Sequence, residues 1–467
     1  MPDPRDFDVP PYQNKMVERT PFLSAADRRA AAERAHYNPF NLRSREVTID
    51  LLSDSGTGAI SAEQEAASWS FGDERYAQSQ AWTPFYGELR DLTGYPYILP
   101  VHQGRAAERI LFPVLLGSGK ISVSNCHFDT THANVGLAGA EARDLPCQEA
   151  WDLGSREPFK GNIDIEALAA LLDGPDGPRV GCVLVTITSN GMGGQPVAMS
   201  NLRATAGLCR AHGVPMLLDA ARFAENAWLV KQREAGYADL SPREIAREAF
   251  DLADGMMISL KKDGLVNIGG AIGLRDQNLH AQCETRLLAG EGFSTYGGLS
   301  GREQARVAQG LREVVDPDYL RARAADTARL TRLINDAGVR TMQPAAIHAV
   351  YLDAGSLLPH LPPAQFPGNA LAMQCFIDGG IRCTELGSLY LGTLNDRLEL
   401  TTPAPFEQVR LAIPRRVYGR AHLDYVAAVI TGIARDPERV VGYRIVSAPE
   451  ILRLFKVQMA PVSANTG

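Results

Sequence analysis

Two charged residues in this sequence each follow an apolar segment, an arrangement expected where side chains do chemistry at the end of a β-strand. Asp219 comes directly after the apolar residues 215–218, and Lys262 follows the largely apolar residues 256–259. Because parallel strands end at one edge of a sheet, we expect the carboxylate and the amine to face the same ligand. A buried lysine can form a Schiff base, and a carboxylate can hold the proton of a pyridinium nitrogen. The pair therefore favours pyridoxal phosphate chemistry.

The ordinary alternative is that Lys261 and Lys262 form a solvated pair and that Asp219 caps a helix. A cofactor phosphate needs backbone N–H donors at the start of a helix, and residues 103–105 supply a glycine turn that leads into strong helix formers. Taken alone, such a turn is more often a loop with a surface charge. Together with the Asp–Lys pair, it favours a phosphate-bearing cofactor.

Two further residues are candidates for holding a flat cofactor and its substrate. Phe128 could stack on a cofactor ring, although a phenylalanine at the end of a strand is more often part of the core. Arg410 is a charge between apolar neighbours, so it is a candidate for binding a substrate carboxylate. An ordinary salt bridge explains the Arg410 pattern equally well.

The elements that must position these residues follow an alternating pattern. From about residue 60 to residue 270, short apolar segments alternate with amphipathic ones, which indicates βαβ units and a mostly parallel sheet. Residues 183–187 predict a buried strand that ends at the glycine-rich loop 191–196. Gly213 is placed to end the next helix, and another strand is expected from Pro215.

The two ends of the chain have different patterns. The first ~60 residues are polar, with a helix expected at residues 25–36. After about Asp316, a long helical run at 320–337 precedes apolar strands near 346–352 and 409–413. This part of the chain predicts a smaller α+β domain.

The composition excludes several classes of protein. The chain has 467 residues, of which 45% are hydrophobic and 22% charged, as in globular proteins, and its net charge of -7 argues against nucleic-acid or membrane partners. A small-molecule substrate is the expected partner. Seven cysteines without C-x-x-C spacing indicate neither a disulfide framework nor a zinc site. No secretory signal and no membrane segment are recognisable, so we expect a cytoplasmic protein.

The sequence resembles the β-eliminating lyases, the family that includes tryptophanase and tyrosine phenol-lyase. The resemblance extends from about residue 35 to residue 455. The matching segments are residues 38–40, 49–58, 72–76, 102–105, 186–190, 193–196, 221–227, 261–263 and 296–299.

The resemblance implies a fold type I, aspartate-aminotransferase-like α/β fold, in which a large domain with a mostly parallel sheet is joined to a smaller α+β domain. It implies an N-terminal arm at residues 1–22, a small domain at 23–58 and 325–467, and a large cofactor-binding domain at 59–324. Pyridoxal phosphate would be attached to Lys262. The other cofactor-binding positions implied are Gln103, Gly104, Arg105, Phe128, Asn190, Asp219, Arg222, Ser259 and Lys261.

The resemblance also implies roles in the reaction. The catalytic positions are Lys262 as the base for the α-proton, Tyr76 as the acid for the leaving carbon, and Asp129 as an assisting group at the indole. The substrate-binding positions are Ser53, Asn190, Arg410 and Leu454. Members of the family also need a monovalent cation such as K⁺ at an interface of a homotetramer, and the matching positions are Gly56, Glu74 and Asn267.

The leaving group is indicated by three positions. Tyrosine phenol-lyases have a threonine where this chain has Asp129, and an arginine where it has Leu386, so the chain is closer to tryptophanase. Leu454 departs from the histidine usual in tryptophanases. We therefore expect β-elimination of L-tryptophan to indole, pyruvate and ammonium. The alternatives are a lyase for a ring-modified tryptophan, a tyrosine or an S-substituted cysteine, and a catalytically silent cofactor-binding regulatory protein.

Overall fold

The computed structural model describes the chain except for residues 1–2, 4–5, 7, 14–16, 71–75 and 463–467. The chain forms two compact units. Unit 1 comprises residues 1–11, 55–150 and 157–323, and unit 2 comprises residues 12–54, 151–156 and 324–467. The division into an arm, a small domain and a cofactor-binding domain stays a prediction.

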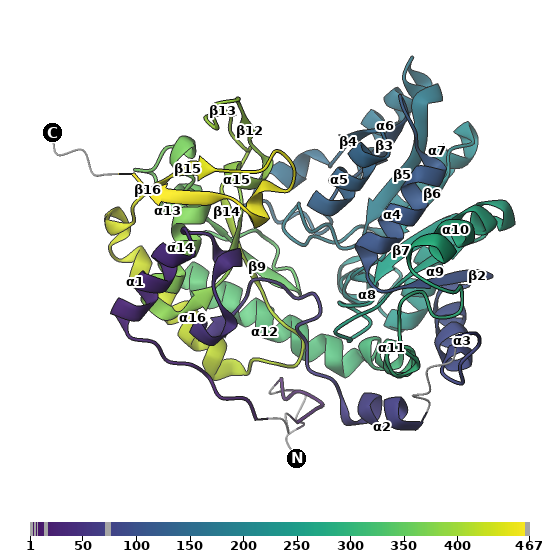
Figure 1. Cartoon of the computed structure of the whole chain (residues 1–467), viewed down its shortest axis with the longest axis horizontal. Coiled ribbons are helices and arrows are strands. Elements are labelled where there is room, and N and C mark those ends of the chain that lie inside the picture. Colours follow the sequence, from purple (N-terminus) through teal and green to yellow (C-terminus); the bar gives the residue numbers. More distant parts are fainter. Residues whose placement is uncertain (1–2, 4–5, 7, 14–16, 71–75, 463–467) are drawn as a thin grey trace. The chain divides into compact units, whose positions relative to one another are not determined.

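Unit 1 is built around a seven-stranded sheet, counted over the described residues (Figure 1). The strand order is β2-β8-β7-β6-β5-β3-β4, and every pairing is parallel except the two made by β8. The strands are β2 (Tyr97–Val101), β3 (Ile121–Ser124), β4 (Glu141–Asp144), β5 (Val180–Thr186), β6 (Met216–Asp219), β7 (Gly255–Ser259) and β8 (Gly270–Leu274). The prediction of a mostly parallel sheet is confirmed.

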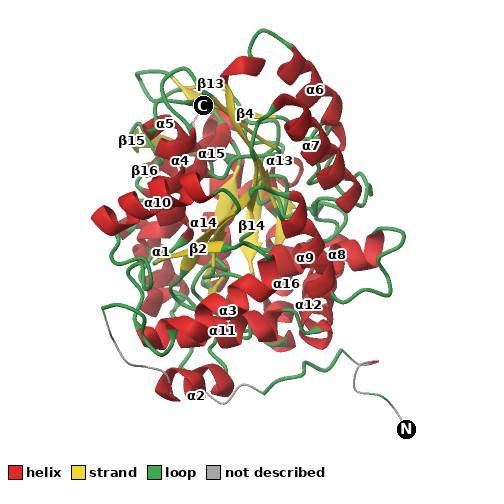
Figure 2. Ribbon diagram, turned by 90° about the vertical axis from the view of Figure 1, so that its right-hand side faces the viewer, coloured by secondary structure: helices red, strands yellow, loops and turns green. Residues whose placement is uncertain are grey.

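Helices cover the strands of this sheet. Helices α4 and α10 lie side by side in both views (Figure 1, Figure 2) and pack with α5 on one face, where Leu111, Val135, Leu184 and Leu217 belong to one buried cluster. The helices of unit 1 are α2 (Ala62–Ser70), α3 (Trp82–Thr93), α4 (Gly104–Leu115), α5 (Asp129–Leu137), α6 (Ile165–Asp173), α7 (Met199–His212), α8 (Phe223–Arg233), α9 (Pro242–Leu252), α10 (Gln277–Gly290) and α11 (Gly301–Val314). Helix α12 (Pro317–Asp336) runs across the boundary between the units.

Local sequence signals set the helix ends. Gly213 ends α7 with φ 64°, a left-handed conformation that glycine adopts without steric cost, as predicted. Ser241 and Glu244 form a capping box at the start of α9, where Pro242 needs no N–H partner. Because these signals fix where each helix ends, they also fix, to within a residue or two, where the next strand or loop begins.

Unit 2 contains a three-stranded antiparallel sheet of order β11-β14-β9 and three strand pairs, counted over the described residues. Helix α14 packs on one face of the sheet, where Phe376, Val409 and Leu411 are buried together. The strands are β1 (Ile49–Asp50), β9 (Ala349–Asp353), β10 (Ile381–Arg382), β11 (Thr384–Leu386), β12 (Thr393–Leu394), β13 (Leu400–Thr402), β14 (Gln408–Ala412), β15 (Tyr443–Ser447) and β16 (Gln458–Pro461). The helices are α1 (Ala25–Arg34), α13 (Ala354–Leu357), α14 (Pro367–Gly379), α15 (Ser388–Leu391) and α16 (Arg420–Ala434).

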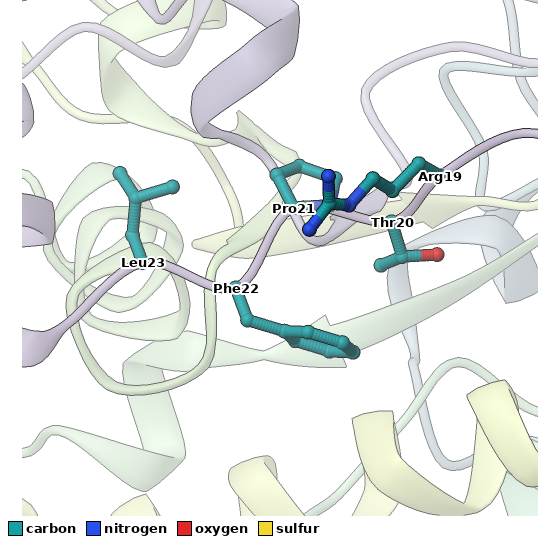
Figure 3. A pocket seen from close by; sticks show the side chains of 5 residues that line it. All are labelled: Arg19, Thr20, Pro21, Phe22 and Leu23. Atoms are coloured by element: carbon teal, nitrogen blue, oxygen red, sulfur yellow. The ribbon is translucent and has the colours of Figure 1, made fainter.

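The helix predicted at residues 25–36 is confirmed as α1, whose N-cap Ser24 accepts a hydrogen bond from the N–H of Asp27. A surface pocket lies beside the preceding segment and is lined by Arg19, Thr20, Pro21, Phe22 and Leu23 (Figure 3). These five residues supply one cation and one hydroxyl, so we assign the pocket no catalytic role. No helix among the described residues is long and apolar enough to cross a membrane.

Candidate active site

The structure brings Asp219 and Lys262 together at the carboxyl ends of two neighbouring strands. Asp219 is the last residue of β6, which pairs in parallel with β7, and Lys262 lies in the turn that follows β7. Burial raises the pKa of Asp219, while the charge of Lys262, an N–H from Ala221 at 3.2 Å and the charge of Arg222 act in the opposite direction. The carboxylate thus lies in the field of two cations, at the sheet edge where ligands bind in this class of fold.

The turn that carries the two lysines is anchored on the neighbouring helix. Asp263 is fully buried and its carboxylate accepts the N–H of Ala224 at 2.8 Å, in the first turn of α8. The two lysines lie in different surroundings. Burial, together with the charge of Arg105, lowers the pKa of Lys261, whereas the charge of Lys262 acts on Asp219. The lowered pKa makes the amine of Lys261 a chemical candidate for the cofactor, whereas Lys262 is the lysine that lies close enough to Asp219 to act on its pKa.

The predicted phosphate site lies where α4 begins. Gly104 is the first residue of α4, and a Cβ there would be 2.8 Å from the Cβ of Ser259, so only glycine leaves room at this point. The N-cap residue Gln103 makes no side-chain hydrogen bond to the helix. The first N–H groups of α4 and the Ser259 hydroxyl therefore form a site that suits an anion.

The loop after β5 contains buried hydroxyl groups that need a partner. Thr188 Oγ1 and Ser189 Oγ are buried and have no hydrogen-bond partner among the described residues. Asn190, the next residue, is also buried. Buried polar atoms are normally hydrogen-bonded, so a bound polar group is expected here. With the glycine at the start of α4, this loop shows that the residues present fit pyridoxal phosphate.

The loop between β3 and α5 carries Phe128 and is fastened by His127. The ring of His127 lies 2.6 Å from the carboxylate of Asp144 and 2.9 Å from the hydroxyl of Ser122. This Ser-His-Asp set resembles a hydrolase triad, but Ser122 lies within β3 and is fully buried, so no substrate reaches its hydroxyl. The set instead fixes the residue that precedes Phe128, and it was not predicted from the sequence.

Glu108 connects the phosphate helix to the helix that follows Phe128. Its carboxylate on α4 accepts hydrogen bonds from Thr131 and Asn134 of α5, each at 2.7 Å. Burial raises the pKa of Glu108 to about 7, against the effect of its hydrogen bonds, and the charge of Asp219 adds to the rise. Sequence analysis missed this residue, because a glutamate within a helix is normally a surface charge.

Tyr76 and the predicted cation-binding residues Gly56 and Asn267 lie elsewhere in unit 1. Tyr76 is 71% exposed, and its ring contacts Phe293 and Tyr296 at centroid distances of 5.3 Å and 5.7 Å. Asn267 donates a hydrogen bond from its amide to the carbonyl of Gly56 at 3.0 Å, so two of the three predicted cation-binding residues are neighbours. The third, Glu74, lies outside the described residues.

In unit 2, Arg410 lies on β14 and is 8% exposed. Its guanidinium donates a hydrogen bond to the carbonyl of Leu52 at 3.1 Å, next to Ser53. Asp54 and Arg415 form a buried ion pair at 2.9 Å directly after this segment. The structure therefore brings the predicted Ser53 and Arg410 into one neighbourhood, and the ion pair holds that segment in place.

Two of the three positions that bear on the leaving group, Leu386 and Leu454, are buried in unit 2. Leu386 lies on β11 in a cluster with Tyr351 and Phe406. Leu454 is 6% exposed and belongs to the main hydrophobic core of the unit. A direct role of Leu454 in substrate binding therefore rests on the family resemblance.

Comparison with known proteins decides the family. The profile described as "Beta-eliminating lyase" matches residues 50–429. A tryptophanase from Salinibacter ruber is 46% identical over 456 residues, which cover 98% of this chain and 96% of that protein. A tyrosine phenol-lyase from Pasteurella multocida is 39% identical over 457 residues, covering 98% and 99%. This chain belongs to the β-eliminating lyase family.

Solved structures at low sequence identity agree with this assignment at the level of the fold. A serine palmitoyltransferase from Sphingomonas wittichii is 14% identical, with a TM-score of 0.59 over 89% of this chain and 97% of that one. A structure described as "SPT with PLP internal aldimine" is 15% identical, with a TM-score of 0.54 over 83% and 87%. The predicted family and the predicted fold type I are confirmed. As a β-eliminating lyase of this fold, the protein is a pyridoxal-phosphate-dependent enzyme.

Proposed function

We propose that this β-eliminating lyase cleaves L-tryptophan to indole, pyruvate and ammonium. The observation that carries the proposal is the 46% identity to a tryptophanase over nearly the whole chain, above the 39% to a tyrosine phenol-lyase. Asp129 and Leu386 support the same substrate, because both differ from the residues usual in tyrosine phenol-lyases.

A first group of residues binds the cofactor and handles protons in the proposed reaction. When bound, pyridoxal phosphate supplies an electron sink for bonds broken at the amino-acid substrate. Lys262 would hold the cofactor and take the α-proton on its Nζ, and Asp219, near Arg222, would hold a proton on the pyridine nitrogen. Gln103, Gly104, Arg105 and Ser259 would bind the phosphate, Lys261 would lie beside them, and Phe128 would stack on the ring.

The substrate is held and split by a second group of residues. Asn190 and Arg410 bind its carboxylate, with Ser53 nearby, since a guanidinium fork matches a carboxylate in shape and charge. Tyr76 donates its phenolic proton to the leaving ring carbon, and Asp129 assists at the indole. These roles follow the family resemblance, and the neighbouring positions of Ser53 and Arg410 support them.

Pyruvate release from a panel of amino acids tests the proposal. We expect the highest kcat/KM with L-tryptophan, lower values with L-tyrosine and S-alkyl cysteines, and equimolar indole and pyruvate from tryptophan. A higher value with tyrosine would contradict the substrate assignment. Cofactor binding without pyruvate from any amino acid would instead establish a catalytically silent protein.

A ring-modified tryptophan is the second candidate substrate, because Leu454 replaces a polar residue with an apolar one. If Leu454 contacts the substrate, it favours alkylated rings by about 0.8 kcal/mol per buried CH₂ group. We expect Leu454→His to shift the ratio of kcat/KM values severalfold toward plain tryptophan and away from ring-methylated tryptophans. Leu452→His is the matched control, since Leu452 is 36% exposed. An unchanged ratio would assign Leu454 to the core alone.

A monovalent cation is part of the proposal, with Gly56, Glu74 and Asn267 supplying hard oxygen ligands at an interface of a homotetramer. We expect activity to rise severalfold when potassium replaces sodium at equal ionic strength, with choline chloride as the control. Light scattering measures the assembly in the same buffers. Equal activity and equal cofactor affinity in all three salts would remove the cation from the proposal.

A further inference from the structure

One carboxylate holds the residue that precedes the predicted phosphate site. Glu291, the C-cap residue of α10, contacts the ring Nδ1 of His102 and accepts the backbone N–H of the same residue at 3.4 Å. The carbonyl of His102 accepts the N–H of Gly269 at 2.7 Å. His102 lies one residue before Gln103 and two before Gly104, the first residue of α4. The carboxylate therefore holds both the side chain and the main chain of the turn that leads into α4.

The loop that begins at Glu291 also lies against this turn. Gly297 has φ 52°, and a Cβ there would collide with the carbonyl oxygen of Pro100, so only glycine allows the two segments to approach so closely. We call residues 291–298 the clamp loop. The clamp loop thus contacts residues 100–102 at both of its ends.

The clamp loop also holds the segment of Tyr76, the proposed acid for the leaving carbon. The ring of Tyr76 lies 5.3 Å from that of Phe293 and 5.7 Å from that of Tyr296, between centroids. Thr295 Oγ1 accepts the backbone N–H of Gln78, two residues after Tyr76, at 2.9 Å. All of these residues belong to unit 1. One loop therefore contacts both the turn before the phosphate site and the residue expected to protonate the leaving group.

We propose that Glu291 is a positioning residue for two parts of the active site: through His102 it sets the turn that binds the cofactor phosphate, and through the clamp loop it sets the place of Tyr76. The inference deepens the proposed function and rests on it, because it takes residues 103–105 as the phosphate site and Tyr76 as the acid. A carboxylate makes charge-assisted hydrogen bonds, which are stronger than neutral ones. Loss of the carboxylate therefore frees the turn and the start of the clamp loop together.

The first test measures the effect at the phosphate, with the full-length enzyme titrated with pyridoxal phosphate after removal of its cofactor. Glu291→Leu and His102→Leu should each raise the dissociation constant about tenfold. The double variant should raise it no further, because the two residues act through one contact. Glu291→Gln and His102→Asn each keep a hydrogen-bonding group at the contact and should restore most of the affinity. The phosphorus NMR signal of the bound cofactor should move in the leucine variants and return in the conservative ones.

The second test separates removal of the α-proton from proton delivery to the leaving carbon. Exchange of the α-proton of tryptophan with solvent deuterium needs Lys262 but not Tyr76, whereas pyruvate release needs both. At saturating cofactor, Glu291→Leu should raise the ratio of exchange to pyruvate release severalfold, in the same direction as Tyr76→Phe. A variant that merely lowers stability would reduce both rates by the same factor.

His212→Leu is the matched control, because His212 also contacts a carboxylate, that of Asp173 at 3.4 Å. These two residues end α7 and α6, which precede β6 and β5, so they lie at the edge of the sheet opposite to the predicted cofactor site. This variant should leave the dissociation constant and the exchange ratio within about twofold of the wild-type values. Glu291→Met repeats both measurements in case the leucine variant does not fold, as judged by its unfolding midpoint.

Four results would overturn the proposal. An unchanged dissociation constant in Glu291→Leu would show that the carboxylate does not act on the phosphate turn, and an unchanged exchange ratio would show that the clamp loop does not act on Tyr76. Additive effects of the two leucine substitutions would show that Glu291 and His102 act separately. Equal effects in His212→Leu would show general destabilisation. Absence of pyruvate from every amino acid with the wild-type enzyme contradicts the proposed function instead, and the dissociation constants and the phosphorus signal then still decide the role of Glu291 at the phosphate.

Discussion

Replacement of Lys262 by alanine is expected to abolish the visible absorbance of the enzyme-bound cofactor and turnover together. One amine supplies both the covalent attachment and the base for the α-proton, so its loss removes two functions at once. The position of Lys262 beside Asp219, at the end of β7, is the structural basis of this expectation. The measurement compares the absorbance spectrum of the purified holoenzyme with pyruvate release from tryptophan.

Lys261→Ala is the matched control, because it removes an identical side chain one residue away. Burial and the charge of Arg105 lower the pKa of Lys261, which makes its amine a chemical competitor for the cofactor. We expect this variant to keep the visible absorbance and to bind the cofactor less tightly. Loss of the absorbance in Lys261→Ala, with retention in Lys262→Ala, would reverse the assignment.

Asp219→Asn is expected to lower kcat at least about 100-fold while the enzyme keeps its cofactor. The carboxylate holds a proton on the pyridine nitrogen and balances its charge, whereas a neutral amide cannot. Burial makes this charge costly, and Lys262, Ala221 and Arg222 partly offset the cost, so the carboxylate is placed for a charged partner. The measurement is kcat for tryptophan at saturating cofactor, with the bound cofactor quantified after release.

Asp173→Asn makes the same chemical change at the end of α6, where the aspartate side chain is 74% exposed. This control should leave kcat within about twofold of the wild-type value, as most surface substitutions do. A similar small effect for Asp219→Asn would show that the pyridine nitrogen is not paired with Asp219. Retained kcat with lost cofactor affinity would assign Asp219 to binding alone.

Much of unit 1 follows from local sequence patterns. Residues 183–187 predicted a buried strand, and β5 (Val180–Thr186) confirms it; Gly213 ends α7 as expected. Strand periodicity and glycine positions are local properties of the sequence. They therefore predict the same element in any fold that buries the apolar residues. The carboxyl ends of parallel strands then meet at one edge, which is why Asp219 and Lys262 could be placed together before the fold was known.

Other parts of the site depend on pairings that the sequence does not encode locally. Glu108 binds Thr131 and Asn134 because α4 and α5 pack side by side, and His127 bridges Ser122 and Asp144 because β3 and β4 are neighbours. Considered one at a time in the sequence, each of these residues would be expected to be a surface charge, a loop residue or a strand residue. Their roles come from distances between elements, which composition and periodicity leave open.

The sequence by itself determined the family, the mostly parallel sheet, and the aspartate and lysine at its edge, since these depend on residue types and on the periods of strands and helices. Only the tertiary structure decided which polar groups are buried together and which are left without partners. The amide of Gln408 is the plainest case: its burial follows from the pairing of β14 with β11 and β9. Strand register is set by packing over the whole unit, so no local pattern around Gln408 could have indicated it.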